Sequence, residues 1–291
     1  MYEPHESLPF PKDKSVRIWR YIDFTKYVDM LETGSLYFSR ADYLGDPFEC
    51  SLPVGMVKRY LADIEKAKAE GTQEGVERAK ILEGNIQFFF EHSRWSALSM
   101  YVNCWHMNKH ESDAMWKIYP SGSEGVAILS TPTRLVKAVQ GNNERISIGK
   151  VSYADYETLD LHSKDGGFNL LNFVAPKRLS FRHENELRAV IWRSNEELAD
   201  NEGYIPCPPG LKVPANLHQL ISAVYVSPTS QAWFRELVQA INKRYRISAE
   251  VRASKLAQMP VQRVGADGLV ERPTKEANGY KLGRTVLPVD K

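Results

Sequence analysis

The chain has 291 residues, of which 43% are hydrophobic and 25% charged, with a formal net charge of +2. This is ordinary globular composition, and so small a charge without a dense basic block neither requires nor excludes a nucleic-acid partner. Three widely spaced cysteines with no CxxC pair favour a reducing compartment and argue against a disulfide framework. No secretory signal and no membrane span is visible, so we expect a soluble cytoplasmic protein without a membrane partner.

The residue pattern predicts one large domain between two less ordered ends. Residues 1–15, with three prolines, predict an N-terminal arm, and residues 259–291, with many Gly, Pro and Lys, predict a loosely held C-terminal tail. No internal repeat and no composition break divides residues 16–258, which we interpret as a single domain.

Alternating apolar and aromatic residues predict short strands at 16–21, 35–39, 100–106, 125–129, 146–153, 177–193, 220–226 and 248–251. Helical periodicity predicts short helices at 24–32, which would end at Gly34, and at 112–119, 133–139, 168–175 and 231–244. Residues 55–95 predict a helical hairpin, inserted between strands, that covers a face of the sheet. Because strands outnumber long helices and do not alternate strictly with them, we expect an α+β fold.

The stretch from Lys177 to Arg193 carries an unusual density of charge for a strand. If it is one strand, four charged side chains share a face: Arg182, Glu184, Glu186 and Arg188. A lone charge taken out of water costs several kcal/mol, so charges that go inside need partners. This face is therefore either the wet side of an edge strand with Glu–Arg pairs or the lining of a polar cleft.

Glu184 and Glu186 form the sharpest candidate for chemistry, although an E-x-E is frequent by chance. On a strand, residues i and i+2 point the same way, so both carboxylates can serve one ligand. One carboxylate accepts hydrogen bonds from a sugar hydroxyl and stabilises positive charge that develops at a sugar carbon. The other orients or deprotonates an incoming nucleophile.

Arg20 is the second candidate, on the first predicted strand. A guanidinium offers two parallel N–H groups to a phosphate or a carboxylate. The alternative is an arginine whose stem packs on Trp19 and Tyr21 while its head stays in water.

A metal site is not expected. Cys104 and His106 share a strand face, and His110 and Glu111 follow closely, but no second ligand pair stands at zinc spacing. The simpler interpretation of His106 is a hydrogen-bonded histidine at a strand end. Trp116 and Tyr119, at i and i+3 on a short helix, fit a core better than a ligand platform. No Walker loop and no GxGxxG, GxSxG or HExxH motif is present.

Several motifs taken together resemble a known family. They are Arg20-Tyr21, Gly34 to Ser39, Asp46-Pro47-Phe48-Glu49, Cys104-Trp105-His106, Met115 to Tyr119, Gly125 to Ile128, and Lys177-Arg178 with His183 to Arg188. In this order, over residues 16–255, the set resembles the bacterial domain-of-unknown-function family numbered 2971. That family usually has Asn before its Asp-Pro-Phe-Glu turn, where this chain has Gly45.

An early arginine strand, a middle strand and a late E-x-E strand are also similar to ADP-ribosyltransferases of the arginine–serine–glutamate type. The resemblance implies a split, strongly bent, mostly antiparallel sheet that binds NAD. Arg20 would hold an NAD phosphate or ribose, Glu186 would take the catalytic place at the nicotinamide ribose, and Glu184 would orient an unknown macromolecular acceptor, protein or nucleic acid. We add three candidate NAD contacts: Tyr21, His106 and Trp116. Where that class has Ser-Thr-Ser, this chain has Asn103 to His106.

Two other functions compete with the transferase. The first is a non-enzymatic sensor or interaction module of a phage-defence or mobile-element system, in which Arg182, Arg188 or Lys177 neutralises the two glutamates. Closed ion pairs with no cleft beside them would favour it. The second is a metal-dependent nuclease in which carboxylates hold Mg²⁺: Asp46, Glu49, Glu184 and Glu186. The transferase requires that Arg20, Glu184 and Glu186 face one open cleft.

Overall fold

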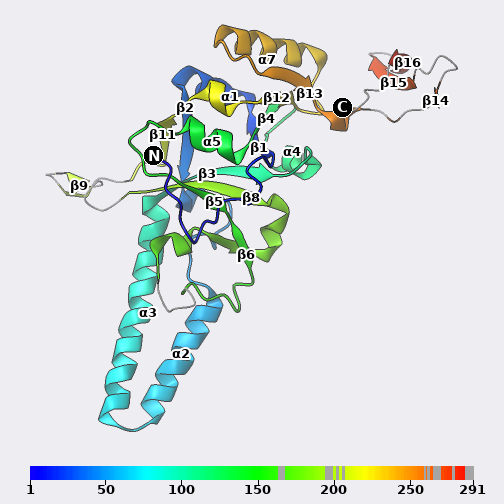
Figure 1. Cartoon of the computed structure of the whole chain (residues 1–291). Helices are drawn as coiled ribbons and strands as arrows, with labels where there is room; N and C mark the ends of the chain where they lie inside the picture. The colour runs from blue at the N-terminus through cyan, green and yellow to red at the C-terminus, as the bar shows by residue number, and fades with distance from the viewer. Residues whose placement is uncertain are drawn as a thin grey trace.

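A computed structural model describes residues 1–162, 168–193, 199–200, 203–204, 207–258, 260, 263–264, 270–276 and 279–285. Within these residues the main sheet has nine strands (Figure 1). Its main path runs in the order β11 (Gly210–Pro214), β2 (Ser35–Arg40), β3 (Met100–Met107), β1 (Ile18–Asp23), β4 (Gly125–Ser130), β12 (Ala223–Val226) and β13 (Glu250–Ala253). β8 (Glu186–Trp192) pairs with β3, and β5 (Ser147–Lys150) pairs with β8.

Every pairing in this sheet is antiparallel except that of β12 with β13. The predicted mixture of helices with a mostly antiparallel sheet is therefore confirmed. Further helices are α1 (Phe24–Thr33), α4 (Asp113–Ile118), α5 (Pro132–Ala138), α6 (Leu217–Leu220) and α7 (Ala232–Arg244). As predicted, α1 ends at Gly34, whose φ of 58° is left-handed and costs glycine little.

The two faces of the sheet carry different cores. On β4, Val126 and Ile128 belong to a cluster with residues of α1, α5 and α7, whereas Ala127 and Leu129 belong to a cluster with α4. Next to the α4 cluster, Val102 of β3 packs with residues of α2 (Val54–Ala69) and α3 (Gln73–Ser99). Because successive side chains of a strand point to opposite faces, the large core lies on one face of the sheet and the two smaller clusters lie on the other.

α2 and α3 lie side by side and extend away from the sheet (Figure 1). Near the sheet, Met56, Tyr60 and Phe89 pack in the same cluster as Val102, and farther out Ala67 contacts the other helix instead. Only the base of this helix pair therefore packs in the cluster that includes a strand of the main sheet, and that the pair is an insert covering a face of the sheet stays a prediction.

One edge of β3 is shared by two strands that do not meet along its length. β2 pairs at Tyr101 and Val102, and β1 pairs at His106 and Met107. Residues 103–105 have no strand partner on that edge among the described residues, so the described sheet is open there. The carbonyl of Cys104, which a neighbouring strand would otherwise bond, accepts a hydrogen bond from the Arg20 side chain.

The predicted continuous strand at 177–193 is wrong. The structure has β7 (Pro176–Arg178), the 3-10 helix η3 (Leu179–Glu184) and then β8. Asn185 lies between η3 and β8. Its φ of 38° is a left-handed conformation, at which the 3-10 helix ends and after which the strand begins. Glu184 and Glu186 therefore do not share a strand, and Arg182 does not belong to the face that carries Arg188.

Several other boundaries also differ from the predictions. The predicted strand at 146–153 is two strands, β5 and β6 (Ser152–Ala154), and the predicted helix at 168–175 is a 3-10 helix, η2 (Leu170–Phe173). The predicted strand at 220–226 begins at Ala223, after α6. β11 was not predicted, because its glycine and proline, Gly210 and Pro214, are residues typical of loops. The short elements η1 (Ala41–Tyr43), β9 (Ala199–Asp200), β10 (Gly203–Tyr204) and η4 (Lys255–Ala257) complete this part.

The first ten residues lie along β5. Tyr2 forms a bridge with Ile146, Lys150 N–H donates to the Pro9 carbonyl at 3.0 Å, and Leu8 is buried. The predicted C-terminal tail, 259–291, contains a small antiparallel sheet of β14 (Arg263–Val264), β15 (Val270–Glu276) and β16 (Gly279–Thr285), and its other residues, apart from residue 260, lie outside the described part. Among the described residues, no helix has the length and apolar character needed to cross a membrane.

Gly149 on β5 allows the N-terminal segment to approach, because a Cβ there would lie 1.9 Å from the Leu8 carbonyl oxygen. We expect Gly149→Ala to lower the free energy of unfolding by about 1–3 kcal/mol, the usual cost of overpacking. Gly84→Ala, in α3 where nothing lies within 4 Å, should instead raise it by about 1 kcal/mol. Urea denaturation of both variants measures the contrast, and equal stability of Gly149→Ala and wild type would contradict it.

Candidate functional site

A cavity of about 560 Å³ lies beside the open part of the sheet. This volume is in the range of small-molecule and cofactor sites. Arg20, Glu184 and Glu186, the three residues that the transferase requires in one cleft, all line it. Aromatic side chains supply much of the remaining wall: Trp19, Tyr21, Tyr37, Tyr43, Trp105, Tyr119 and Phe181.

Arg20 is a half-buried cation that no carboxylate neutralises within the described part of the chain. Its guanidinium donates to the carbonyls of Cys104 at 3.2 Å and Tyr37 at 3.4 Å, and lies 5.9 Å from the centre of the Trp105 ring. Burial lowers the pKa of Arg20 from its ordinary value. The alternative, with the guanidinium in water and the stem on Trp19 and Tyr21, is not what the structure has. A guanidinium held this way can donate hydrogen bonds to an anionic group.

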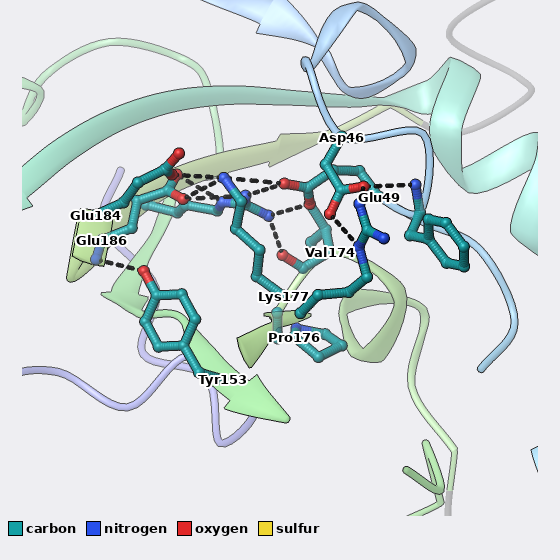
Figure 2. A network of polar contacts seen from close by, with 12 residues as sticks. Asp46, Glu49, Tyr153, Val174, Pro176, Lys177, Glu184 and Glu186 are labelled. Atoms are coloured by element: carbon teal, nitrogen blue, oxygen red, sulfur yellow. Dashed lines mark hydrogen bonds and ion pairs between the residues drawn. The ribbon is translucent and has the colours of Figure 1, made fainter. Parts of the chain in front are cut away.

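Arg188 also borders the cavity and is fully buried. Its guanidinium donates to both carboxylate oxygens of Glu49, at 2.9 and 2.7 Å, and to both oxygens of Glu186, at 2.8 and 3.1 Å. The Val174 carbonyl accepts a further hydrogen bond at 2.7 Å. Figure 2 shows these groups converging from separate parts of the chain.

Lys177 joins the third carboxylate to this network. Its ammonium lies 2.6 Å from Oε2 of Glu184 and 3.4 Å from a carboxylate oxygen of Glu186 and of Glu49. The network thus contains three carboxylates and two cations. One negative charge remains unbalanced, and Oε1 of Glu184 accepts no hydrogen bond from the described residues.

The pKa shifts follow from this arrangement. Burial alone would raise the pKa of Glu186, but Arg188 and Lys177 outweigh burial and lower this pKa to about 2. Burial opposes the charged form of Lys177, yet Glu186 and Glu49 raise its pKa. The same two carboxylates raise the pKa of Arg188 against the effect of its burial. All three groups are therefore charged at neutral pH.

Local backbone structure turns both glutamates toward the cavity although they do not share a strand. The left-handed Asn185 is fixed by Met107, whose N–H donates to the Asn185 carbonyl at 2.9 Å and whose carbonyl accepts from the Asn185 amide at 2.5 Å. His106 Nδ1 lies 2.5 Å from the Glu184 carbonyl. These contacts attach the turn between η3 and β8 to the end of β3.

Of the other three predicted NAD contacts, two line the cavity and Trp116 does not. Tyr21 and His106 line the cavity. Trp116 packs edge-on behind Tyr21, with ring centres 5.0 Å apart, and donates from Nε1 to Glu111 at 3.1 Å. Tyr119, which we expected in the core, is 43% exposed and lines the cavity. The spacing i, i+3 predicts that Trp116 and Tyr119 lie on one side of a helix, but it does not predict which of the two is buried in the core.

The carboxylates proposed for a nuclease face cations instead of one another. Asp46 accepts two hydrogen bonds from Arg178, at 3.0 and 2.6 Å (Figure 2). Glu49 and Glu186 both face Arg188. In the part of the chain that the structure describes, no group of three or more His, Cys, Asp or Glu side chains is placed to hold a metal ion. No observation here favours the nuclease.

Glu49 is the residue whose role sequence reasoning missed, because it appeared there as part of a turn motif and as a nuclease carboxylate and not as a partner of Arg188. Its contact with Arg188 spans 139 residues, and no local pattern reports such a distance. The available signal was the Asp-Pro-Phe-Glu turn itself, whose first and last residues each face an arginine of the late motif.

No family model and no curated protein matches this chain. The chain is similar to two solved structures of Thermus sp. 2.9 DarT. For DarT in complex with NAD+, the TM-score is 0.36 at 10% identity over 85% of this chain and 98% of that chain. For DarT in complex with ADP-ribosylated ssDNA, the TM-score is 0.34 at 10% identity over 84% and 95%. The resemblance to the family numbered 2971 stays a prediction.

The lowered pKa of Glu186 predicts acid sensitivity. A carboxyl with an ordinary pKa of 4.5 and a folded-state pKa of about 2 stabilises the fold fully above pH 4.5 and loses that contribution as the pH falls toward 2. The contribution is of the order of 3 kcal/mol at about 1.4 kcal/mol per pKa unit. We therefore expect the unfolding free energy of Glu186→Gln to change less than that of wild type across this interval.

Urea denaturation at a series of pH values from neutral to about 2 measures this difference. Glu236→Gln, an exposed change on α7, serves as the matched loss of one carboxylate. Parallel pH curves for wild type and Glu186→Gln would contradict the prediction.

Proposed function

We propose that the cavity binds NAD or a related nucleotide and that the protein transfers ADP-ribose to a macromolecular acceptor. The observation that supports this most directly is the charge of the cavity wall. Arg20 is a cation without a carboxylate partner among the described residues, and the network around Glu184 carries one negative charge more than its cations balance. The wall is therefore positive at one place and negative at another.

The oxidised nicotinamide dinucleotide matches this polarity. Its diphosphate is anionic and its nicotinamide ring is cationic, so Arg20 suits the first and the carboxylates suit the second. An arginine holds a phosphate through paired charge-assisted hydrogen bonds. The aromatic wall, with Tyr37 and Tyr119 among its members, offers apolar faces to rings and sugars.

The proposed chemistry needs few protein groups. When the bond between C1′ of the ribose and the nicotinamide nitrogen breaks, its electron pair leaves with nicotinamide and positive charge develops on the sugar. A carboxylate fixed beside the sugar stabilises that charge because it is already ionised and held in place. The open edge of β3 at Arg20 also supports the proposed split sheet of an ADP-ribosyltransferase, in which α2 and α3 form an insert.

A second candidate is a non-enzymatic sensor that binds the same nucleotide. The ion pairs around Glu186 are closed, as this alternative expects. A cavity lies beside them, however, which a purely structural network does not require. The two candidates differ in turnover: the transferase releases nicotinamide from NAD and modifies an acceptor, whereas the sensor only binds.

Turnover is tested by incubating the full chain with NAD, with and without protein or nucleic-acid acceptors. Nicotinamide release and labelling from NAD that carries a tagged adenine are the two readouts. Release or labelling supports the transferase, and binding without either supports the sensor. The absence of both binding and turnover contradicts the proposed ligand.

Binding is tested at Arg20. We expect Arg20→Met to weaken the affinity for ADP-ribose by about 10- to 100-fold, since a hydrogen bond to a charged group contributes about 1.5–3 kcal/mol. Arg17→Met is the matched control, because Arg17 is exposed and donates only to the Lys109 carbonyl among the described groups. Isothermal titration calorimetry measures both affinities. An unchanged affinity in Arg20→Met would remove Arg20 from the ligand site.

A further inference from the structure

We propose that Glu184, rather than Glu186, supplies the carboxylate oxygen that contacts the reacting ribose, and that Glu186 is a positioning residue. This inference rests on the proposed function and deepens it, because it divides the roles of the two carboxylates. The resemblance gave the catalytic place to Glu186. The hydrogen bonds of the two side chains point to the opposite assignment.

Glu186 has little capacity left for a ligand. A carboxylate offers about four lone-pair positions. Oε1 accepts from Arg188 Nε at 2.8 Å, and Oε2 accepts from a terminal nitrogen of Arg188 at 3.1 Å and from Lys177 at 3.4 Å. The Cys104 thiol donates to the same carboxylate. A ribose hydroxyl would have to displace one of these buried donors.

Glu184 differs from Glu186 in that one of its carboxylate oxygens is available to a ligand. Its Oε2 is bonded to Lys177 at 2.6 Å, and its Oε1 accepts no hydrogen bond within the described chain, although the residue lines the cavity. Its position is nevertheless fixed, because the backbone carbonyl bonds His106 and the left-handed Asn185 follows. Glu184 is thus held in place with one oxygen available.

The surplus charge of the network also falls on Glu184. Arg188 is bound by both oxygens of Glu49 and both oxygens of Glu186, so those two carboxylates share its charge as well as that of Lys177. Glu184 has Lys177 as its single cationic contact, and Lys177 also faces the other two carboxylates. A cationic ligand group, or a sugar carbon that becomes cationic, therefore gains most beside Glu184.

The bond between C1′ and the nicotinamide nitrogen breaks, and the electron pair goes to nicotinamide, which leaves as a neutral molecule. The acceptor oxygen or nitrogen forms the new bond to C1′, and its proton passes to Oε1 of Glu184 and then to water. With water as the acceptor, the products are ADP-ribose, nicotinamide and one proton. Glu186 acts only through its ion pairs with Lys177, which contacts Glu184, and with Arg188.

The experiment compares Glu184→Gln with Glu186→Gln in the full chain. We expect Glu184→Gln to keep the wild-type melting temperature, because the amide oxygen still accepts from Lys177. Its kcat for nicotinamide release should fall by about 100-fold or more, in the range found for removal of a group that assists proton transfer. Its affinity for nicotinamide mononucleotide, the half of NAD that carries the cationic ring, should also fall, which a structural role would not cause.

For Glu186→Gln we expect a lower melting temperature and, per folded molecule, a kcat at least about tenfold above that of Glu184→Gln. If Glu186→Gln does not fold, Glu186→Asp, which keeps the charge, takes its place, and the Glu184→Gln result decides by itself. Glu236→Gln controls for the loss of an exposed carboxylate.

Retained turnover in Glu184→Gln, or a larger loss per folded molecule in the Glu186 variant, overturns this division of roles and leaves the proposed function standing. A wild-type chain that neither binds ADP-ribose nor releases nicotinamide overturns the proposed function itself, and the division of roles with it.

Discussion

The buried guanidinium of Arg188 is the constraint on which the rest of this structure depends. A charge with no exposure to water needs compensation from every side, and Arg188 obtains it from Glu49, Glu186 and the Val174 carbonyl. These groups come from three segments that are distant in sequence. The turn after η1, the end of η2 and the start of β8 must therefore assemble together, because removal of one partner from a buried pair costs about 3–5 kcal/mol.

Such a network is weak evidence for stability by itself, since well-packed apolar residues often replace buried ion pairs at no cost. The presence of an extra carboxylate, Glu184, is harder to explain by stability. Lys177 must serve three carboxylates, and Oε1 of Glu184 is left without a hydrogen bond at the cavity wall. An arrangement that keeps one oxygen available in a buried network is what a ligand site needs.

Sequence patterns predicted most elements and brought attention to Arg20, Glu184 and Glu186, which the structure places on one cavity. They failed where the backbone leaves regular geometry. The period of two in residues 177–193 continues through Asn185, so no pattern marks the left-handed residue that separates η3 from β8. Pairing partners were also missed, because the attraction of Glu49 for Arg188 depends on the fold and not on local spacing.

The opening in the sheet and the charged network act on the same cavity from two directions. β1 and β2 leave part of the β3 edge without a strand, and Arg20 bonds the Cys104 carbonyl exposed there. The same β3 pairs on its other edge with β8, which carries Glu186 and Arg188. One strand therefore fixes the separation of the positive and negative parts of the wall. A ligand with both an anionic and a cationic group, such as the proposed NAD, matches both parts of this wall better than a simple phosphate does.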